Sequence, residues 1–367
     1  MSLLKDIYST DFFNEFIKLS SKIIPEFKKE KFKKAVSSKD FKILELKQRS
    51  SFLAVLLNDL MDSNFEKKSK QLLKLCETIK KSNKFKSNFP FIFIPEIYER
   101  AGIDHPIISL NAFEKITSLI SCEFAIRPFI ERHEKGSMQK IHSWTSHSDE
   151  HVRRLASEGI RPKLPWASEL KKFRQDPKPI IEVLHKLKND ESEYVRRSVA
   201  NNLNDVSKDH PELLIEILKA WKGANENTDK LLKHASRTLL KQGHTEVMKI
   251  FDYGDKEVIS IEDFDLKKNK IQFPGVLEFY CCIKNNKKIA INTRLEYGIY
   301  FRKANGSLSK KVFKISERKL NGLEEQKIEK KHSLVSISTR KYHEGIHGVS
   351  IIINGFEGPI KEFNLKF

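Results

Sequence analysis

The run EHVRRLASEGIRPKLPW at residues 150–166 brings together an acid, two arginines and a tryptophan that could do chemistry. Glu158 falls in the last turn of a predicted helix, where the partial negative charge of the carbonyl ends disfavours an acid by roughly 0.3–1 kcal/mol. Arg154, one turn earlier, and Arg161, just beyond the helix, can offset that cost. Trp166 follows a proline-bracketed connector. This arrangement indicates a site, although a solvated helix end with a partly buried tryptophan fits the spacing as well.

The elements that must position these side chains are a short amphipathic helix and a stiff connector. Either Ser148 or Asp149 can cap the start of the helix. Val152, Leu155 and Ala156 have the i, i+3, i+4 spacing of a face that packs on a core. A glycine then ends the helix, and two prolines fix the path of the chain towards the tryptophan.

The segment VRRLASEGIRPKLPW, residues 152–166, closely resembles the signature of the AlkC branch of the AlkC/AlkD DNA glycosylases. Proteins of that family are built from HEAT repeats and remove alkylated bases from DNA. The resemblance implies a monofunctional glycosylase that acts on cationic lesions of the 3-methyladenine and 3-methylcytosine type in duplex DNA, without a cofactor. It also implies a second acid near the lesion, Glu123. From spacing alone, Glu123 lies in a helical pattern over 109–133 and could pair with Arg127.

The chemistry of such a reaction suggests a role for each residue. A cationic base is already a good leaving group, so the difficulty is the positive charge that develops on the sugar. Glu158 would stabilise that charge and orient a water, and the face of Trp166 would attract the cationic base by about 0.5–2 kcal/mol. Arg154 and Arg161 would grip phosphates beside the lesion. Further contacts with the DNA backbone are assigned to Lys163, Arg196, Arg197, Lys233, His234 and Arg237.

A weak internal repeat supports a helical scaffold. Val152-Arg153-Arg154 recurs 43 residues later as Val195-Arg196-Arg197, and a looser copy starts at Asp229. HEAT-type units run about 40–47 residues with a pair of helices each. We therefore predict an α-α superhelix of HEAT-like repeats over residues 1–252, with a basic stripe on its concave side. The acid and the tryptophan occur in one copy only, since positions 201 and 209 hold Asn and Asp.

The hydrophobic pattern changes after about residue 253. Short alternating runs replace the helical spacing, and Asn-Asn or Asn-Gly pairs separate them. Some seven such strands over residues 253–367 predict an antiparallel Ig-like β-sandwich, although the chain lacks a Cys, Trp, Cys pattern. Many members of the AlkC branch carry an extension of this kind, so the resemblance covers both predicted domains.

Composition narrows the class of partner. Lysine and arginine exceed acids by 19 in 367 residues, which favours a polyanion: nucleic acid first, an anionic membrane surface second. No apolar run reaches about 20 residues, and the N-terminus lacks a secretion signal. Four cysteines do not form a metal-spaced set, and His147 and His151 lack a third ligand, so no metal is expected. We expect a cytoplasmic monomer that works at the bacterial nucleoid.

Two functions from different classes fit these observations. One is the base-removing enzyme. The other is a non-catalytic HEAT scaffold that binds nucleic acid or acidic proteins through the same basic stripe. The repeat pattern and the charge suit both, and only the departure EG-x-RP-x-LPW from plain repeat sequence favours the enzyme.

Overall fold

A computed structural model describes residues 4–254, 258–338 and 340–367 of the chain. The chain forms two compact units, the first made of Met1–Asp209 and Gly223–Ala235 and the second of His210–Lys222 and Ser236–Phe367. Helices give way to strands between residues 250 and 259, near the predicted change. As a division into domains, the boundary at 252/253 stays a prediction.

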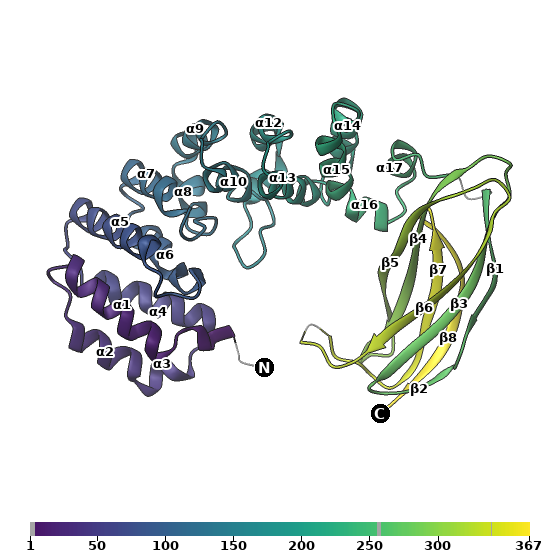
Figure 1. Ribbon diagram of the computed structural model, residues 1–367, viewed down its shortest axis with the longest axis horizontal. Coiled ribbons are helices and arrows are strands. Elements are labelled where there is room, and N and C mark those ends of the chain that lie inside the picture. The colour runs from purple at the N-terminus through teal and green to yellow at the C-terminus, as the bar shows by residue number, and fades with distance from the viewer. Residues whose placement is uncertain (1–3, 255–257, 339) are drawn as a thin grey trace. The chain divides into compact units, whose positions relative to one another are not determined.

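The first unit is helical throughout (Figure 1). Its elements, with η marking a 3-10 helix, are η1 (Leu4–Ile7), α1 (Thr10–Ile23), α2 (Lys29–Ser37), α3 (Lys39–Ile43), α4 (Leu46–Asp59), α5 (Phe65–Lys81), η2 (Phe89–Ile92), α6 (Phe93–Ala101), α7 (Pro106–Ile116), α8 (Arg127–Arg132), α9 (Glu134–Trp144), α10 (Glu150–Glu158), α11 (Lys171–Gln175), α12 (Lys178–Leu187), α13 (Glu193–Val206) and α15 (Glu226–Ala235).

The helices of this unit stack in two layers. In Figure 1, α5, α7, α9 and α12 follow one another in one layer, and α6, α8, α10 and α13 follow one another in the other. Each layer is held by a buried apolar face, such as Val195, Val199 and Leu203 on α13. This is the stacking that a repeat of helix pairs requires, because one pair cannot bury its own apolar face alone.

The prediction of a continuous helix over 109–133 is wrong. The structure has α7, which ends at Ile116, then a stretch of turns that contains Glu123, and then α8 from Arg127. Pro128 occupies the first turn of α8 and so begins a helix instead of ending one. A proline suits that position because the missing N–H has no partner there in any helix.

In its described residues, the second unit combines helices with two β-sheets. Its elements are α14 (Pro211–Trp221), α16 (Arg237–Lys241), α17 (Thr245–Ile250), β1 (Ile259–Leu266), β2 (Lys270–Gln272), β3 (Gly275–Asn285), β4 (Ile291–Arg302), β5 (Leu308–Leu320), β6 (Glu325–Leu334), β7 (Gly345–Ile353) and β8 (Phe356–Lys366). The sheets have the strand orders β1-β3-β6 and β2-β8-β7-β4-β5. All pairings are antiparallel except the short parallel pair β2 and β8.

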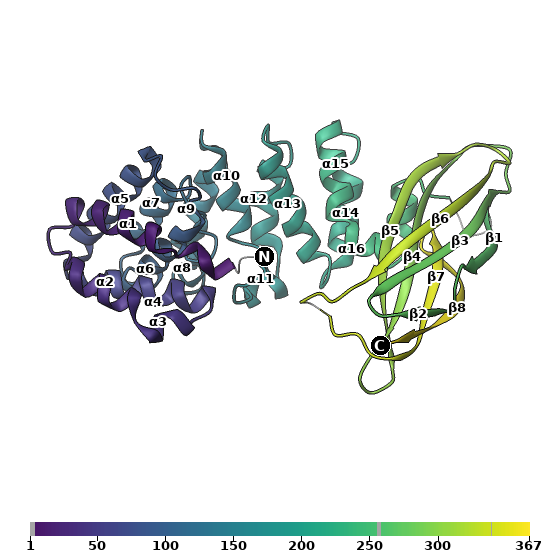
Figure 2. The same cartoon turned by 60° about the horizontal axis from the view of Figure 1, so that its bottom comes forward.

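The two sheets face each other around one apolar core (Figure 2). Alternate residues of β3, such as Leu277, Phe279 and Cys281, point into that core, as do Leu295 and Ile299 of β4. The period-two burial explains why the strands were visible in the sequence. The predicted fold class, a mainly helical repeat body with a C-terminal Ig-like sandwich, is confirmed. Among the described residues, no helix is both long and apolar enough to cross a membrane.

Candidate active site

The helix that carries the predicted site, α10, forms for the reasons seen in the sequence. Asp149 caps it, because its Oδ1 accepts a hydrogen bond of 2.8 Å from the amide of His151. Val152, Leu155 and Ala156 are completely buried and fix which face of the helix points inwards. The helix ends at Glu158, as expected. These local contacts therefore determine where the acid lies.

A buried arginine holds the connector that follows α10. The guanidinium of Arg127 donates hydrogen bonds to the carbonyls of Gly159 at 3.2 Å, Arg161 at 2.8 Å and Ser168 at 3.0 Å. Burial, the largest effect, lowers the pKa of Arg127 to about 10. The expected pair between Glu123 and Arg127 is therefore wrong. Arg127 binds both ends of the connector, and its positive charge satisfies backbone carbonyls that would otherwise lie unpaired.

Trp166 sits at the far end of this connector in an unusual conformation. Its φ is +70°, a region that bulky residues adopt rarely and usually at functional sites. The side chain is 64% exposed, so the alternative of a partly buried tryptophan does not hold. Its carbonyl accepts a hydrogen bond from the ammonium of Lys47 on α4. The indole is thus presented to solvent from a backbone that is held from both sides.

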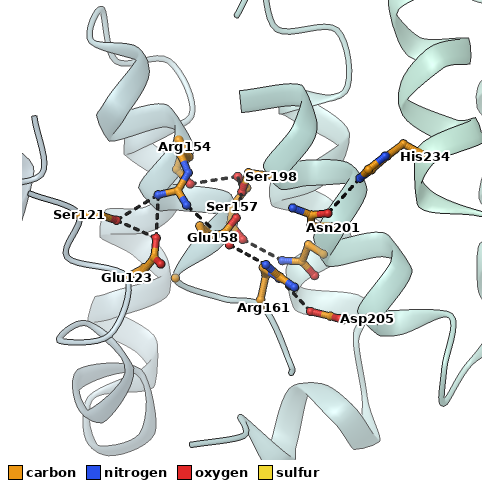
Figure 3. A network of polar contacts seen from close by, with 12 residues as sticks. Ser121, Glu123, Arg154, Ser157, Glu158, Arg161, Ser198, Asn201, Asp205 and His234 are labelled. Atoms are coloured by element: carbon orange, nitrogen blue, oxygen red, sulfur yellow. Dashed lines mark hydrogen bonds and ion pairs between the residues drawn. The ribbon is translucent and has the colours of Figure 1, made fainter. Parts of the chain in front are cut away.

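Glu158 itself is buried and fully engaged (Figure 3). Its side chain is only 6% exposed. One carboxylate oxygen lies 2.6 Å from Nη1 of Arg161 and 3.7 Å from Nη2 of Arg154, and the other accepts a hydrogen bond of 2.6 Å from Ser198 on α13. The carboxylate therefore lies between two guanidinium groups, as the spacing predicted, and little of it is exposed to solvent.

These contacts belong to a longer chain of alternating charges. At one end Glu123 lies 2.7 Å from Nη1 of Arg154. At the other end Arg161 lies 2.8 Å from Asp205, and Asp205 lies 2.8 Å from Lys208. Figure 3 shows the network reaching from the turn before α8, across α10, to α13. Because most of its members are buried, salt screens these ion pairs much less than pairs on the surface.

Two buried residues are among the members of the network that the sequence did not suggest. Asp205 is 1% exposed and Ser198 is 2% exposed, and both lie on α13 in the following repeat. Neither has a counterpart in the signature run. One signal was present: Asn202, Asn204 and Asp205 place polar groups on a helix whose neighbouring positions are apolar and buried. Buried polar side chains of this kind need partners, and their number marks α13 as part of the site.

Arg154 and Arg161 bind carboxylates in this structure and are largely buried. Burial disfavours the charge on each guanidinium, but the carboxylates beside them outweigh burial, so the pKa values of both are raised. Their predicted role as phosphate ligands stays a prediction. What the structure adds is a different role, in which the two arginines orient Glu123, Glu158 and Asp205.

Two further predicted DNA contacts have structural partners in the same unit. Lys163 lies 2.9 Å from Asp209. Arg196 donates to the carbonyls of Asp190 at 2.6 Å and Glu191 at 2.9 Å, which closes the loop before α13. Both positions are accounted for by folding, and their contact with DNA stays untested.

The other four predicted DNA contacts lie on different helices, and they belong to both units of the chain. Arg197 has a side chain that is 68% exposed, and Lys233 and His234 lie on α15 of the same unit. His234 makes a hydrogen bond of 3.1 Å with Asn201, the residue that takes the place of Glu158 in the second copy of the repeat. Arg237 belongs to the second unit. Of this group, Arg197 is the most accessible cation on the helices that carry the network.

No group of three or more potential ligands that could hold a metal ion occurs in the described part of the chain.

Comparisons with known proteins indicate the family to which the chain belongs. Residues 118–240 match the model of a family described as DNA alkylation repair enzyme, and residues 260–367 match the C-terminal Ig-like domain of the uncharacterised protein YhaZ. The chain is 36% identical to YhaZ of Bacillus subtilis over 97% of both proteins. It is also similar to a solved structure of the alkylpurine DNA glycosylase AlkC from Pseudomonas fluorescens, bound to DNA with an abasic site analogue. That similarity has 29% identity, covers 100% of both chains and has a TM-score of 0.93.

The network from Glu123 to Asp205 lies wholly inside the span that matches the repair family, and the Ig-like match covers residues 260–367. The relative from Bacillus and the structure from Pseudomonas each cover both parts. On this evidence the chain belongs to the AlkC-type family of DNA alkylation repair enzymes.

Proposed function

We propose that this chain is a monofunctional DNA glycosylase that hydrolyses the N-glycosidic bond of cationic alkylated bases, of the 3-methyladenine and 3-methylcytosine type, in duplex DNA. One observation carries the proposal: a buried carboxylate, Glu158, placed between two guanidinium groups inside the span that matches DNA alkylation repair enzymes. The full-length similarity to an alkylpurine DNA glycosylase bound to DNA supports it.

The reaction needs charge stabilisation more than proton transfer. When the bond between the sugar and a cationic base stretches, the base leaves with the bonding electrons as a neutral molecule, and positive charge builds on the deoxyribose. A carboxylate in a site with little water stabilises that charge strongly, because water no longer screens it. Water then adds its hydroxyl to the sugar carbon and loses a proton, which leaves an abasic site.

The geometry favours Glu158 for this role and gives Glu123 a supporting one. Arg154 lies 2.7 Å from Glu123 but 3.7 Å from Glu158, so Glu123 draws the guanidinium towards itself. The contact with Arg154 is therefore the longest of the three contacts described for Glu158, and it is the one that an incoming positive charge would replace. Arg161 stays bound to its other side, anchored in turn by Asp205.

Trp166 supplies the contact with the base. Its indole is exposed, and its backbone is held at the end of the connector. Binding of a ligand to the ring therefore costs little additional conformational entropy. A tryptophan face attracts a cation by about 0.5–2 kcal/mol. A methylated cationic base therefore binds better there than its neutral, undamaged counterpart. We place the protein in the bacterial cytoplasm as a monomer that acts on the nucleoid.

The direct test is to incubate the purified full-length protein with methylated duplex DNA and to detect the released base by chromatography. We expect 3-methyladenine to be released, with an equal amount of abasic sites left in the DNA. Binding to the same DNA without release of any base would contradict the proposal and favour the non-catalytic scaffold.

A further inference from the structure

A cavity beside the ion network has no role in the chemistry described so far. Its volume is about 380 Å³, within the range of small-molecule sites, and it is walled by α4, α6, the turn before α8 and the end of the connector. Trp166 and Ser121 both line it. The Ser121 hydroxyl also contacts Glu123 and Arg154, as Figure 3 shows, so the cavity begins where the ion network ends.

Three aromatic side chains on the wall of this cavity are only partly covered by other residues. Phe124 is 38% exposed and Trp166 is 64% exposed, and Phe89 is half-buried. Most other phenylalanines of this unit lie in its core. Flat, exposed rings at the wall of a concave site are typical of pockets that take a planar heterocycle by stacking.

Two carboxyl groups of α6 also line the cavity, and their surroundings differ. Glu96 is saturated, because it accepts from Ser51 at 2.6 Å, from Ser50 at 3.2 Å and from Arg100 at 2.8 Å. Glu99 is half-buried and has no hydrogen bond or ion pair with any described residue. Burial, followed by the charge of Glu96, raises the pKa of Glu99 to about 7. Near neutral pH this carboxyl can therefore either donate or accept a hydrogen bond.

The chemistry of the wall excludes the more obvious ligands. A DNA phosphate would meet the carboxylate of Glu96 and the half-buried Glu99, while Arg127 directs its donors to backbone carbonyls. A purely apolar ligand would leave Glu99 unpaired and half-buried, which costs free energy. A planar ring with a hydrogen-bonding edge satisfies both conditions.

We propose that this cavity binds the released methylated purine, with the ring against Trp166 and Phe124 and its amino and ring-nitrogen edge at Glu99. Neutral 3-methyladenine presents an amino donor beside a ring-nitrogen acceptor, and a carboxylic acid presents the matching acceptor and donor. The inference rests on the proposed function, because that reaction is the source of the base. A base held in the cavity would leave the sugar exposed to the attacking water next to Glu158.

The test measures binding of free 3-methyladenine to the full-length protein by calorimetry, without DNA. We compare the wild type with Glu99→Leu, which removes the polar edge, and Glu99→Gln, which keeps one donor and one acceptor. Glu77→Leu, at an exposed acid of α5, is the matched control. Thermal unfolding of each variant reports whether it folds.

We expect the wild type, Glu99→Gln and Glu77→Leu to bind the base with similar affinity. Glu99→Leu should bind at least about tenfold more weakly, which corresponds to roughly 1.4 kcal/mol. Equal affinity of Glu99→Leu and wild type, or no binding by the wild type, overturns the cavity assignment, whether or not the protein releases bases from DNA. Binding of the free base by a protein that cannot release it from DNA would instead sink the proposed function and leave the cavity assignment standing.

Discussion

The guanidinium of Arg154 has contacts on three sides, and each contact limits the positions that it can occupy. Glu123 lies at 2.7 Å and Glu158 at 3.7 Å, while the ring of Tyr194 covers the guanidinium, 4.7 Å from its central carbon. Tyr194 itself is 42% exposed. An aromatic face over an arginine stabilises the charge and blocks one direction of movement. We infer that Tyr194 holds Arg154 close to Glu123, so that the contact between Arg154 and Glu158 stays the weaker one and can be replaced by an incoming positive charge.

Replacing Tyr194 tests this positioning role. In Tyr194→Ala the guanidinium can move towards Glu158, and we expect single-turnover base release to fall about tenfold. Tyr194→Phe keeps the ring face and should restore most of that rate. Release by Tyr194→Ala at the wild-type rate, measured on the same methylated duplex, would show that the ring has no such role.

Glu99 provides a pH test at the same scale. Its pKa is raised from 4.5 to about 7, mainly by burial and next by Glu96, with Arg100 opposing them. The folded state therefore holds this proton more tightly than the unfolded state. That contribution to stability is complete below the unfolded pKa and disappears as the pH rises through the folded pKa.

We accordingly expect the stability of the wild type, relative to Glu99→Gln, to fall between about pH 4.5 and pH 7.5. The midpoint of urea unfolding, followed for both proteins across this range, measures the difference. A constant difference, or one that grows with pH, would contradict the raised pKa.

At the scale of elements, the two copies of the repeat share one structural device. Arg153 donates to the carbonyls of His147 and Ser148, and Arg196, 43 residues later, donates to the carbonyls at positions 190 and 191. Arg153 also pairs with Asp190, in the loop before α13. The first arginine of each pair therefore closes a loop, and the second, Arg154 or Arg197, points elsewhere.

This difference predicts unequal effects on stability. Arg153→Met should lower the free energy of unfolding by roughly 3 kcal/mol, because Asp190 would stay buried without its cation. The exposed Arg197, replaced in the same way, should change it by less than about 0.5 kcal/mol. Urea unfolding of the helices, followed by circular dichroism, compares them. Equal losses for both variants would mean that the two arginines do not have separate roles.

The sequence predicted those parts of the site that depend on neighbours along the chain. The cap, the apolar stripe and the end of α10 follow from spacing over a few residues, and so do the two arginines beside Glu158. The partners supplied by α13, Ser198 and Asp205, depend on how one repeat stacks on the next, which local spacing does not contain. The helix expected over 109–133 is wrong because a stretch of turns separates α7, which ends at Ile116, from α8, whose first turn holds Pro128.

At the scale of the whole molecule, the net positive charge of the chain favours binding to DNA. The ion pairs do not reduce the excess of 19 positive charges, because each pair contains one acid for each cation. The strands of the second unit were visible in the sequence through their alternation, and the repeats through their period. Neither pattern identifies which cations contact phosphate.

Salt dependence measures the number of such contacts directly. We expect the affinity for undamaged duplex DNA to fall linearly with salt on a logarithmic plot, with a slope steeper than about −3. The cause is the release of counterions from the phosphates that the protein neutralises. Fluorescence anisotropy between 50 and 200 mM salt, about the range in which this effect is large, gives the slope. A slope near zero would remove the DNA backbone as the partner of the basic surface.

The central claim is that Glu158 stabilises the positive charge on the sugar of a damaged nucleotide. The most direct measurement is single-turnover release of 3-methyladenine by Glu158→Gln, with DNA affinity measured in parallel and with Glu150→Gln, an exposed acid of the same helix, as control. The account predicts that Glu158→Gln releases the base at least about 100-fold more slowly while its DNA affinity changes little. Release by Glu158→Gln at the rate of the wild type and of the control would contradict it.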